Sequence, residues 1–187
     1  MSEELIVRHC SPTLAGLKTG SLFPARFTDE NELRNTVRSL NHMLLKKGLR
    51  VLPLRYRNGT GLIYVYRPAH LQNDLQDEAA AALLAECGYC GNNAGQCIAQ
   101  LVKRLQTSEE FPHEIGLFLG YPTVDVQGFI QNKAQNFKCS GLWKVYGDVE
   151  QTQKTFALYK KCTRIYCEQW SRGKDIERLT VADSYKN

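Results

Sequence analysis

Apolar side chains recur at helical spacing along residues 29–47, near the start of the chain. Asp29 can accept hydrogen bonds from the first free backbone N–H groups, and Gly48 can adopt the left-handed conformation that ends many helices. The apolar stripe consists of Leu33, Val37, Leu40 and Leu44. The pattern therefore predicts one helix whose stripe packs into the core.

The first residues of the chain show a different pattern. Residues 4–9 indicate a short strand that ends at Cys10. Ser11-Pro12 is typical of a helix start, because serine caps well and proline suits the first helical position. We therefore expect Cys10 at the junction between a strand and a short helix that ends near residue 17.

A small sheet is predicted from residues 21–27 and 49–67. Residues 49–67 contain two runs rich in strand-forming residues around Asn58-Gly59, which favours a tight hairpin turn. Residues 21–27 are expected to be extended, and Pro24 restricts them to a sheet edge. The predicted sheet therefore includes the hairpin of residues 49–67.

The rest of the chain is predicted to be mainly helical, with one returning strand over residues 142–146. The order of strands and helices is neither a regular alternation of strand and helix nor an all-helical pattern. The fold class is therefore expected to be α+β: a small mixed, largely antiparallel sheet packed with several helices in one domain, residues 1–187. The helices are expected over residues 77–88, 94–105, 113–119, 123–135 and 148–171.

Composition indicates a globular protein of the cytoplasm. Hydrophobic residues make up 43% of the 187 residues, no apolar run reaches the roughly 20 residues of a membrane-spanning helix, and the first residues do not resemble a secretion signal. We therefore expect no membrane insertion. The seven cysteines are expected to be reduced thiols, because their number is odd and no oxidising compartment is indicated.

The net charge of +5 is concentrated near the C-terminus. Residues 133–187 contain eleven Lys and Arg against six Asp and Glu, whereas residues 1–132 contain thirteen of each kind. Such an excess can attract nucleic acid, an anionic ligand or an acidic protein, but on a chain of this length it more often forms a solvated face. Nucleic acid is therefore kept as a minor alternative.

Three stretches of the chain resemble a known family. They are HCSPTLAGLKTGSLF at 9–23, FPHEIGLFLGYPTVDVQGFI at 111–130, and KCSGLWKVYGD with YKKCTRIYC at 138–167. They are similar to the family catalogued as domain of unknown function 3793, found mainly in anaerobic Gram-positive bacteria. The resemblance implies a cytoplasmic bacterial protein tied to iron or redox physiology. It carries no cofactor and no catalytic residue over to this chain.

Cys10 is the candidate nucleophile of a thiol-dependent enzyme. At the expected helix start, free N–H groups and the helix dipole would favour its thiolate, with His113 as candidate general base. His9, Thr13 and Lys18 are the candidate ligand-binding residues around it. The alternative is that Cys10 is a small buried residue without chemistry.

The other cysteines are weighed as metal ligands or redox groups. Cys87 and Cys90 form a CxxC, but this pair follows a helix instead of opening one, which argues against a reactive thiolate. No metal site is favoured, because no second CxxC completes a zinc motif. If a metal is bound, the expected ligands are Cys139, Cys162 and Cys167, and ordinary buried thiols are the alternative.

Residues 114–130 have the apolar spacing of a helix-turn-helix. The expected recognition helix presents Asp125 and Gln127 but few cations, whereas phosphate neutralisation carries much of the affinity for DNA. A structural pair of helices is therefore favoured over a DNA-binding regulator.

Three hypotheses of function follow from these patterns. The first is an accessory protein that binds a small molecule or a protein partner, the second is the thiol enzyme at Cys10, and the third is the regulator using residues 114–130. We rank them in that order. The chain has no phosphate-binding loop, dinucleotide fingerprint or nucleophile elbow, so no familiar cofactor is indicated.

Overall fold

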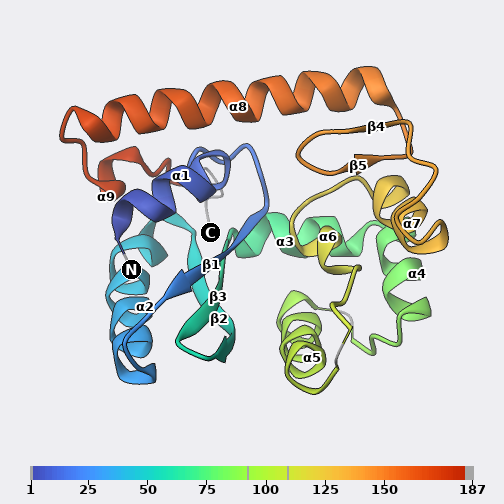
Figure 1. Ribbon diagram of the computed structural model, residues 1–187, viewed down its shortest axis with the longest axis horizontal. Helices are drawn as coiled ribbons and strands as arrows, with labels where there is room; N and C mark the ends of the chain where they lie inside the picture. The colour runs from blue at the N-terminus through green and yellow to red at the C-terminus, as the bar shows by residue number, and fades with distance from the viewer. Residues whose placement is uncertain (1, 92, 109, 184–187) are drawn as a thin grey trace. The chain divides into compact units, whose positions relative to one another are not determined.

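The computed structural model describes residues 2–91, 93–108 and 110–183 (Figure 1). The chain forms two compact units. Unit 1 combines Met1–Ala69 with Lys161–Asn187, and unit 2 is His70–Lys160. Helices and small antiparallel sheets occur together, which confirms the α+β class. The single domain expected from the sequence stays a prediction.

Unit 1 contains a three-stranded antiparallel sheet in the order β1-β3-β2. The strands are β1 (Gly20–Arg26), β2 (Arg50–Arg57) and β3 (Thr60–Tyr66). Asn58 and Gly59, both at positive φ (51° and 72°), join β2 to β3 as in a two-residue hairpin. The predicted hairpin is confirmed, and β1 lies at an edge as Pro24 requires.

One face of this sheet packs against helices α1 (Glu3–Leu14) and α2 (Glu30–Leu44). Asp29 caps α2 by accepting from the Glu32 N–H at 2.8 Å. The short 3₁₀ helix η1 (Leu45–Lys47) follows, and Gly48 ends it at φ 81°. The predicted helix over 29–47 is therefore confirmed. Its stripe joins the core of unit 1, which includes Ile6, Cys10, Leu14, Phe23, Leu33, Leu40, Leu44, Val51, Ile63 and Val65.

The predicted strand over residues 4–9 is wrong, since these residues lie in α1. Ser2 caps this helix through its bond from the Leu5 N–H, so the helix begins well before Ser11. Pro12 lies inside the last turns, and the Ser11 hydroxyl donates to the Val7 carbonyl oxygen. The helix forms because Ile6, Cys10 and Leu14 recur at four-residue spacing and pack together into the core.

Arg67, which directly follows β3, is fully buried in unit 1. Its guanidinium donates to the carbonyl oxygens of Thr13 (2.7 Å), Leu14 (2.8 Å) and Val181 (2.8 Å). It also forms an ion pair with Asp183. One side chain therefore joins the end of α1 to the segment that follows the helix α9 (Ile176–Leu179).

Unit 2 is mainly helical. The predicted helices over 77–88 and 94–105 are confirmed, and Gly88 at φ 82° follows the first of them. The returning strand is confirmed but is only two residues long. The elements are α3 (Pro68–Gln76), α4 (Glu78–Glu86), α5 (Ala94–Thr107), α6 (Ile115–Phe118), α7 (Thr123–Gln131), β4 (Cys139–Ser140) and β5 (Lys144–Val145).

Helix α8 (Val149–Ser171) begins in unit 2 and ends in unit 1, and it confirms the predicted C-terminal helix. Helix α3, which starts at Pro68 just before unit 2, was not expected from the sequence. Among the described residues, no helix combines the length and apolar character needed to cross a membrane.

Candidate functional site

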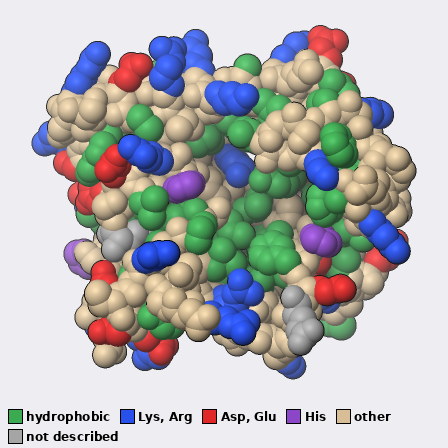
Figure 2. Space-filling model, in the orientation of Figure 1, with side chains coloured by type: hydrophobic (Ala, Val, Ile, Leu, Met, Phe, Trp, Pro, Cys, Tyr) green, Lys and Arg blue, Asp and Glu red, His purple; other side chains and the backbone are tan. Residues whose placement is uncertain are grey.

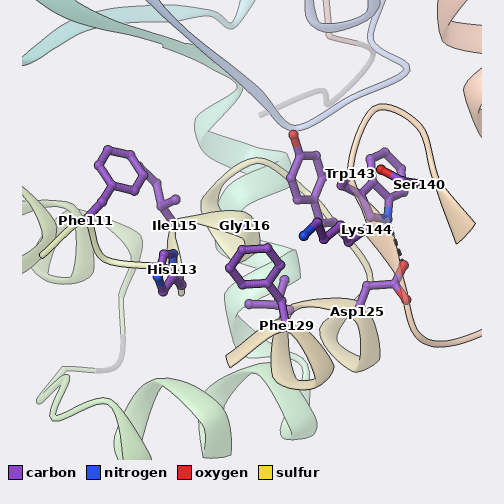
Figure 3. Close-up of a pocket in the computed structure, with 11 residues that line it drawn as sticks. Phe111, His113, Ile115, Gly116, Asp125, Phe129, Ser140, Trp143 and Lys144 are labelled. Carbon is purple, nitrogen blue, oxygen red and sulfur yellow. Dashed lines mark hydrogen bonds between the residues drawn. The ribbon is translucent and has the colours of Figure 1, made fainter. Parts of the chain in front are cut away.

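A pocket of about 360 Å³ lies in unit 2, a volume in the range of small-molecule sites. Its walls come from the segment before α6, from α6 and α7, and from the β4–β5 hairpin (Figure 3). Aromatic and aliphatic side chains form most of the lining. The lining residues are Phe111, His113, Ile115, Gly116, Tyr121, Asp125, Val126, Phe129, Ser140, Trp143 and Lys144.

Asp125 on α7 holds the β4–β5 side of the pocket in place. This carboxylate is 2% exposed. It accepts from the Trp143 indole N–H at 2.8 Å and from the backbone N–H groups of Tyr146 (2.7 Å) and Gly147 (2.8 Å). Because all three bonds stay within the protein, Asp125 positions the pocket wall and leaves ligand contacts to other groups.

Trp143 is fixed between two further aromatic rings. Its indole stacks on Tyr121 with centroids 4.5 Å apart, and it meets the ring of Phe156 edge-on at 4.5 Å. Burial raises the pKa of the Tyr121 phenol, so this ring stays neutral. Two of these packed rings, Tyr121 and Trp143, line the pocket and give it a rigid aromatic wall against which a flat ligand can pack.

The approach of α6 to α7 depends on Gly116 in the pocket lining. A Cβ atom at this position would lie 2.8 Å from Val126 Cγ2, which is closer than real side chains approach. The absence of a side chain therefore lets the two helices meet, and it leaves space for the pocket beside them.

His113 and Lys144 bring basic groups to this apolar pocket. Figure 3 shows the two side chains on opposite sides of the Phe129 ring. The His113 ring contacts Phe129 edge-on at 5.0 Å. The Lys144 amine donates to the Ala134 carbonyl oxygen at 2.7 Å and lies 4.7 Å from the centre of the Phe137 ring. Both side chains can meet an acidic or hydrogen-bond-accepting group of a ligand.

An ionic network around the buried carboxylate of Glu114 supports the segment that carries His113. Glu114, 3% exposed, accepts from the Tyr89 hydroxyl at 2.9 Å and pairs with Arg104 Nε at 3.0 Å. Arg104 also donates to the Cys87 carbonyl oxygen at 2.5 Å. Burial and the Glu114 carboxylate raise the pKa of the Tyr89 phenol. The network anchors the start of α6 to α5 and to the end of α4.

Cys10 is in a different environment from the one its sequence context predicts. It lies inside α1, fully buried, instead of at a helix start. Burial raises the pKa of its thiol, although nearby Lys18 and a hydrogen bond with Ser21 act in the opposite direction. The expected activation by free N–H groups is therefore wrong. His113, its candidate base, belongs to unit 2, whereas Cys10 belongs to unit 1.

The three candidate ligand-binding residues near Cys10 have separate roles. His9 is exposed and stacks on Phe23 with centroids 5.2 Å apart. Thr13 is buried and shares a hydrogen bond of 2.9 Å with the Ser21 hydroxyl. Burial lowers the pKa of Lys18 to about 8. Of the three, Thr13 forms a hydrogen bond that satisfies a polar group inside unit 1.

The three cysteines expected as metal ligands fall in different units of the chain. Cys139 lies on β4 in unit 2, whereas Cys162 and Cys167 lie on the part of α8 that belongs to unit 1. In the described part of the chain, no three His, Cys, Asp or Glu side chains are grouped to hold a metal ion. Burial raises the pKa of Cys87 in the CxxC, which follows α4 as expected.

Residues 114–130 form a one-turn helix and a nine-residue helix instead of two full helices. Asp125, expected on the DNA-facing surface, is buried beneath Trp143. This segment forms part of the pocket wall in unit 2.

Sequence reasoning identified His113 but missed the other pocket residues. They are ordinary aromatic, small and charged residues, and only the fold brings residues 111–129 and 140–144 together. One signal was available: every lining residue falls within the two stretches 111–130 and 138–148, on which the family resemblance rests.

Fold and pocket together define an α+β protein with a preformed aromatic site. Comparison with known families matches residues 6–180 to the family described as "Protein of unknown function (DUF3793)". The chain belongs to this family. Searches of curated proteins and of solved structures found no match.

Proposed function

We propose that this protein is a small-molecule-binding protein and that its ligand occupies the pocket of unit 2. The ligand combines a flat apolar ring system with an acidic group. The observation that carries the proposal is the pocket itself, in which a rigid aromatic wall faces the basic side chains of His113 and Lys144.

The ring system follows from the shape of the lining. Trp143, Tyr121 and Phe129 offer aromatic faces and edges, and ring contacts of this kind contribute about 0.5–1.5 kcal/mol beyond burial of their area. The acidic group follows from Lys144. Its ammonium group has three N–H donors, of which one bonds the Ala134 carbonyl oxygen.

The proposal includes the cytoplasm of a bacterium as the site of action, together with the link to iron or redox physiology that the resemblance implies. Support for the cytoplasm comes from the sequence, whose odd number of cysteines, seven, is typical of a protein with reduced thiols.

Two probes that share one ring system, one anionic and one neutral, test the pocket. Calorimetric titration of the full chain with 2-naphthoate and with 2-naphthalenemethanol measures binding of the same ring system with and without a carboxylate. We expect both to bind with a negative heat-capacity change, and naphthoate to bind more tightly.

Variants then locate the site. Lys144→Met is expected to weaken naphthoate binding about tenfold, as for loss of one charged hydrogen bond, and to leave naphthalenemethanol almost unchanged. Phe129→Ala is expected to weaken both probes. Lys154→Met is the matched control, because Lys154 is exposed on α8, pairs with Glu150 and does not line the pocket. Binding of neither probe, or equal effects of the two lysine variants, would contradict the proposal.

A further inference from the structure

Every charged residue in the three strands of unit 1 is an arginine. The strands contain no Lys, Asp or Glu. The four residues are Arg26 on β1 and Arg50, Arg55 and Arg57 on β2.

The register places all four arginines on the same face of the sheet. Arg26 and Arg57 both pair with Thr60, one from each side, and Arg55 pairs with Leu62. Arg50 pairs with Tyr66. Residues paired in register share a face, and successive residues of a strand alternate between faces. Since Ile63 and Val65 face the core with α1 and α2, the arginines lie on the opposite face.

The surroundings of these arginines differ from those of several other exposed basic residues. In the parts of the chain that the structure describes, no Asp or Glu forms an ion pair with any of the four. Helix α8 is different, because Lys154 pairs with Glu150 and Arg164 with Glu168. Figure 2 shows basic side chains along this helix at the top of the view. The sheet face is therefore the less neutralised of the two basic surfaces.

Charge is also divided unequally between the units. The residues of unit 1 include 17 Lys and Arg against nine Asp and Glu, a net charge of +8. Those of unit 2 include seven against ten, a net charge of −3. The modest +5 of the whole chain therefore conceals a strongly basic unit.

We propose that the arginine face of the β1-β3-β2 sheet binds the phosphate backbone of single-stranded nucleic acid. Arginine presents a planar fork of N–H donors that matches a phosphate group, and four arginines without a single lysine favour this recognition over general attraction. This function is independent of the pocket in unit 2.

The spacing of the arginines suits a chain of phosphates. Arg26 and Arg57 are separated by two strand spacings, about 9.5 Å, and Arg55 lies about 7 Å from Arg57 along the same strand. Arg26 and Arg57 are exposed, and Arg55 is half-buried. The three guanidinium groups can therefore contact neighbouring phosphates of one strand.

The same face indicates how binding occurs. Tyr64 and Tyr66 share it and stack on each other at 4.6 Å, but both are buried, so bases do not stack on them. Binding therefore rests on phosphate contacts, which do not read sequence. None of the exposed large hydrophobic side chains in the described chain belongs to these strands, which disfavours insertion into a lipid surface.

The test is fluorescence anisotropy of the full chain with labelled 20-nucleotide oligo(dT) and oligo(rU) across a salt series from 50 to 200 mM. We compare Arg26→Gln/Arg57→Gln with Arg34→Gln/Arg38→Gln. The second pair lies exposed on α2, in the helical layer on the other face of the sheet, and removes the same charge. The face variant is expected to bind at least tenfold more weakly at 50 mM. The slope of log K against log salt concentration should become less steep by about 1.4 for this variant, since each phosphate contact of a single strand contributes about 0.7.

Two further variants keep the test decisive if the double variant unfolds. Arg55→Gln alone should lower the slope by about 0.7, and Arg26→Lys/Arg57→Lys should retain the slope with weaker binding. The proposal is overturned by any of three results: no binding at 50 mM salt, equal losses in the two glutamine pairs, or tighter binding to vesicles of anionic phospholipid than to either oligonucleotide.

Discussion

The indole N–H of Trp143 donates to Asp125 Oδ2 at 2.8 Å, while the other oxygen of the same carboxylate accepts two backbone N–H groups that follow β5. One side chain on α7 thereby positions both an aromatic wall of the pocket and the backbone behind it. The pocket depends on this carboxylate even though the three groups it bonds lie 18 to 22 positions after Asp125 in the chain.

Asp125→Asn is expected to lower the free energy of unfolding by about 2 kcal/mol, because an amide offers one acceptor oxygen to three donors and turns its own N–H₂ group toward some of them. Urea denaturation followed by tryptophan fluorescence measures the change. Naphthoate binding should weaken as well, since Trp143 loses its partner.

Asp148→Asn is the control for this variant. Asp148 accepts from the Gln151 N–H at the start of α8, and asparagine caps a helix about as well as aspartate. We expect the free energy of unfolding to change by less than about 0.5 kcal/mol in this control. If the two variants lost similar amounts of unfolding free energy, the role assigned to the buried Asp125 carboxylate would be wrong.

Arg67→Met is expected to destabilise the protein by about 3–5 kcal/mol, because it leaves Asp183 and three carbonyl oxygens without the buried guanidinium. Chemical denaturation measures this loss. Arg67→Lys should also be strongly destabilising, since an ammonium group cannot reproduce the planar fork.

Arg164→Met controls for removal of an arginine from unit 1. Arg164 is exposed and its ion pair with Glu168 spans 3.6 Å, so we expect a change within about 0.5 kcal/mol. A small effect at Arg67, comparable to that at Arg164, would refute the assigned role of the buried guanidinium.

Thiol alkylation is expected to distinguish Cys90 from Cys10. Cys90 is exposed, whereas Cys10 is fully buried and burial raises its pKa. In native protein at pH 8, mass spectrometry after iodoacetamide treatment should therefore find Cys90 modified first and Cys10 last. Without reductant, denatured anaerobic protein should show all seven cysteines as free thiols. Rapid native modification of Cys10 would restore the thiol-enzyme hypothesis, and a stable disulfide would contradict the proposed location in the cytoplasm.

The elements that sequence predicted well are those whose signals are local. Asp29 and Gly48 mark the ends of α2 and η1, and Asn58-Gly59 specifies the hairpin through backbone geometry that few other residue pairs adopt. Residues 4–9 were misassigned because Ser11-Pro12 is also a good helix start. The packing of Ile6, Cys10 and Leu14 into one core instead favours a continuous helix over residues 3–14.

The sequence by itself determined the fold class, the bounds of α2 and of the β2–β3 hairpin, and the family to which the chain belongs. Only the tertiary structure decided the chemistry. It buried Cys10 away from any helix start, gathered the pocket from α6, α7 and the β4–β5 hairpin, and aligned the arginines of β1 and β2 on one sheet face. The physical reason is that propensities and caps act within a few residues, whereas burial, pKa shifts and converging side chains depend on contacts between distant segments.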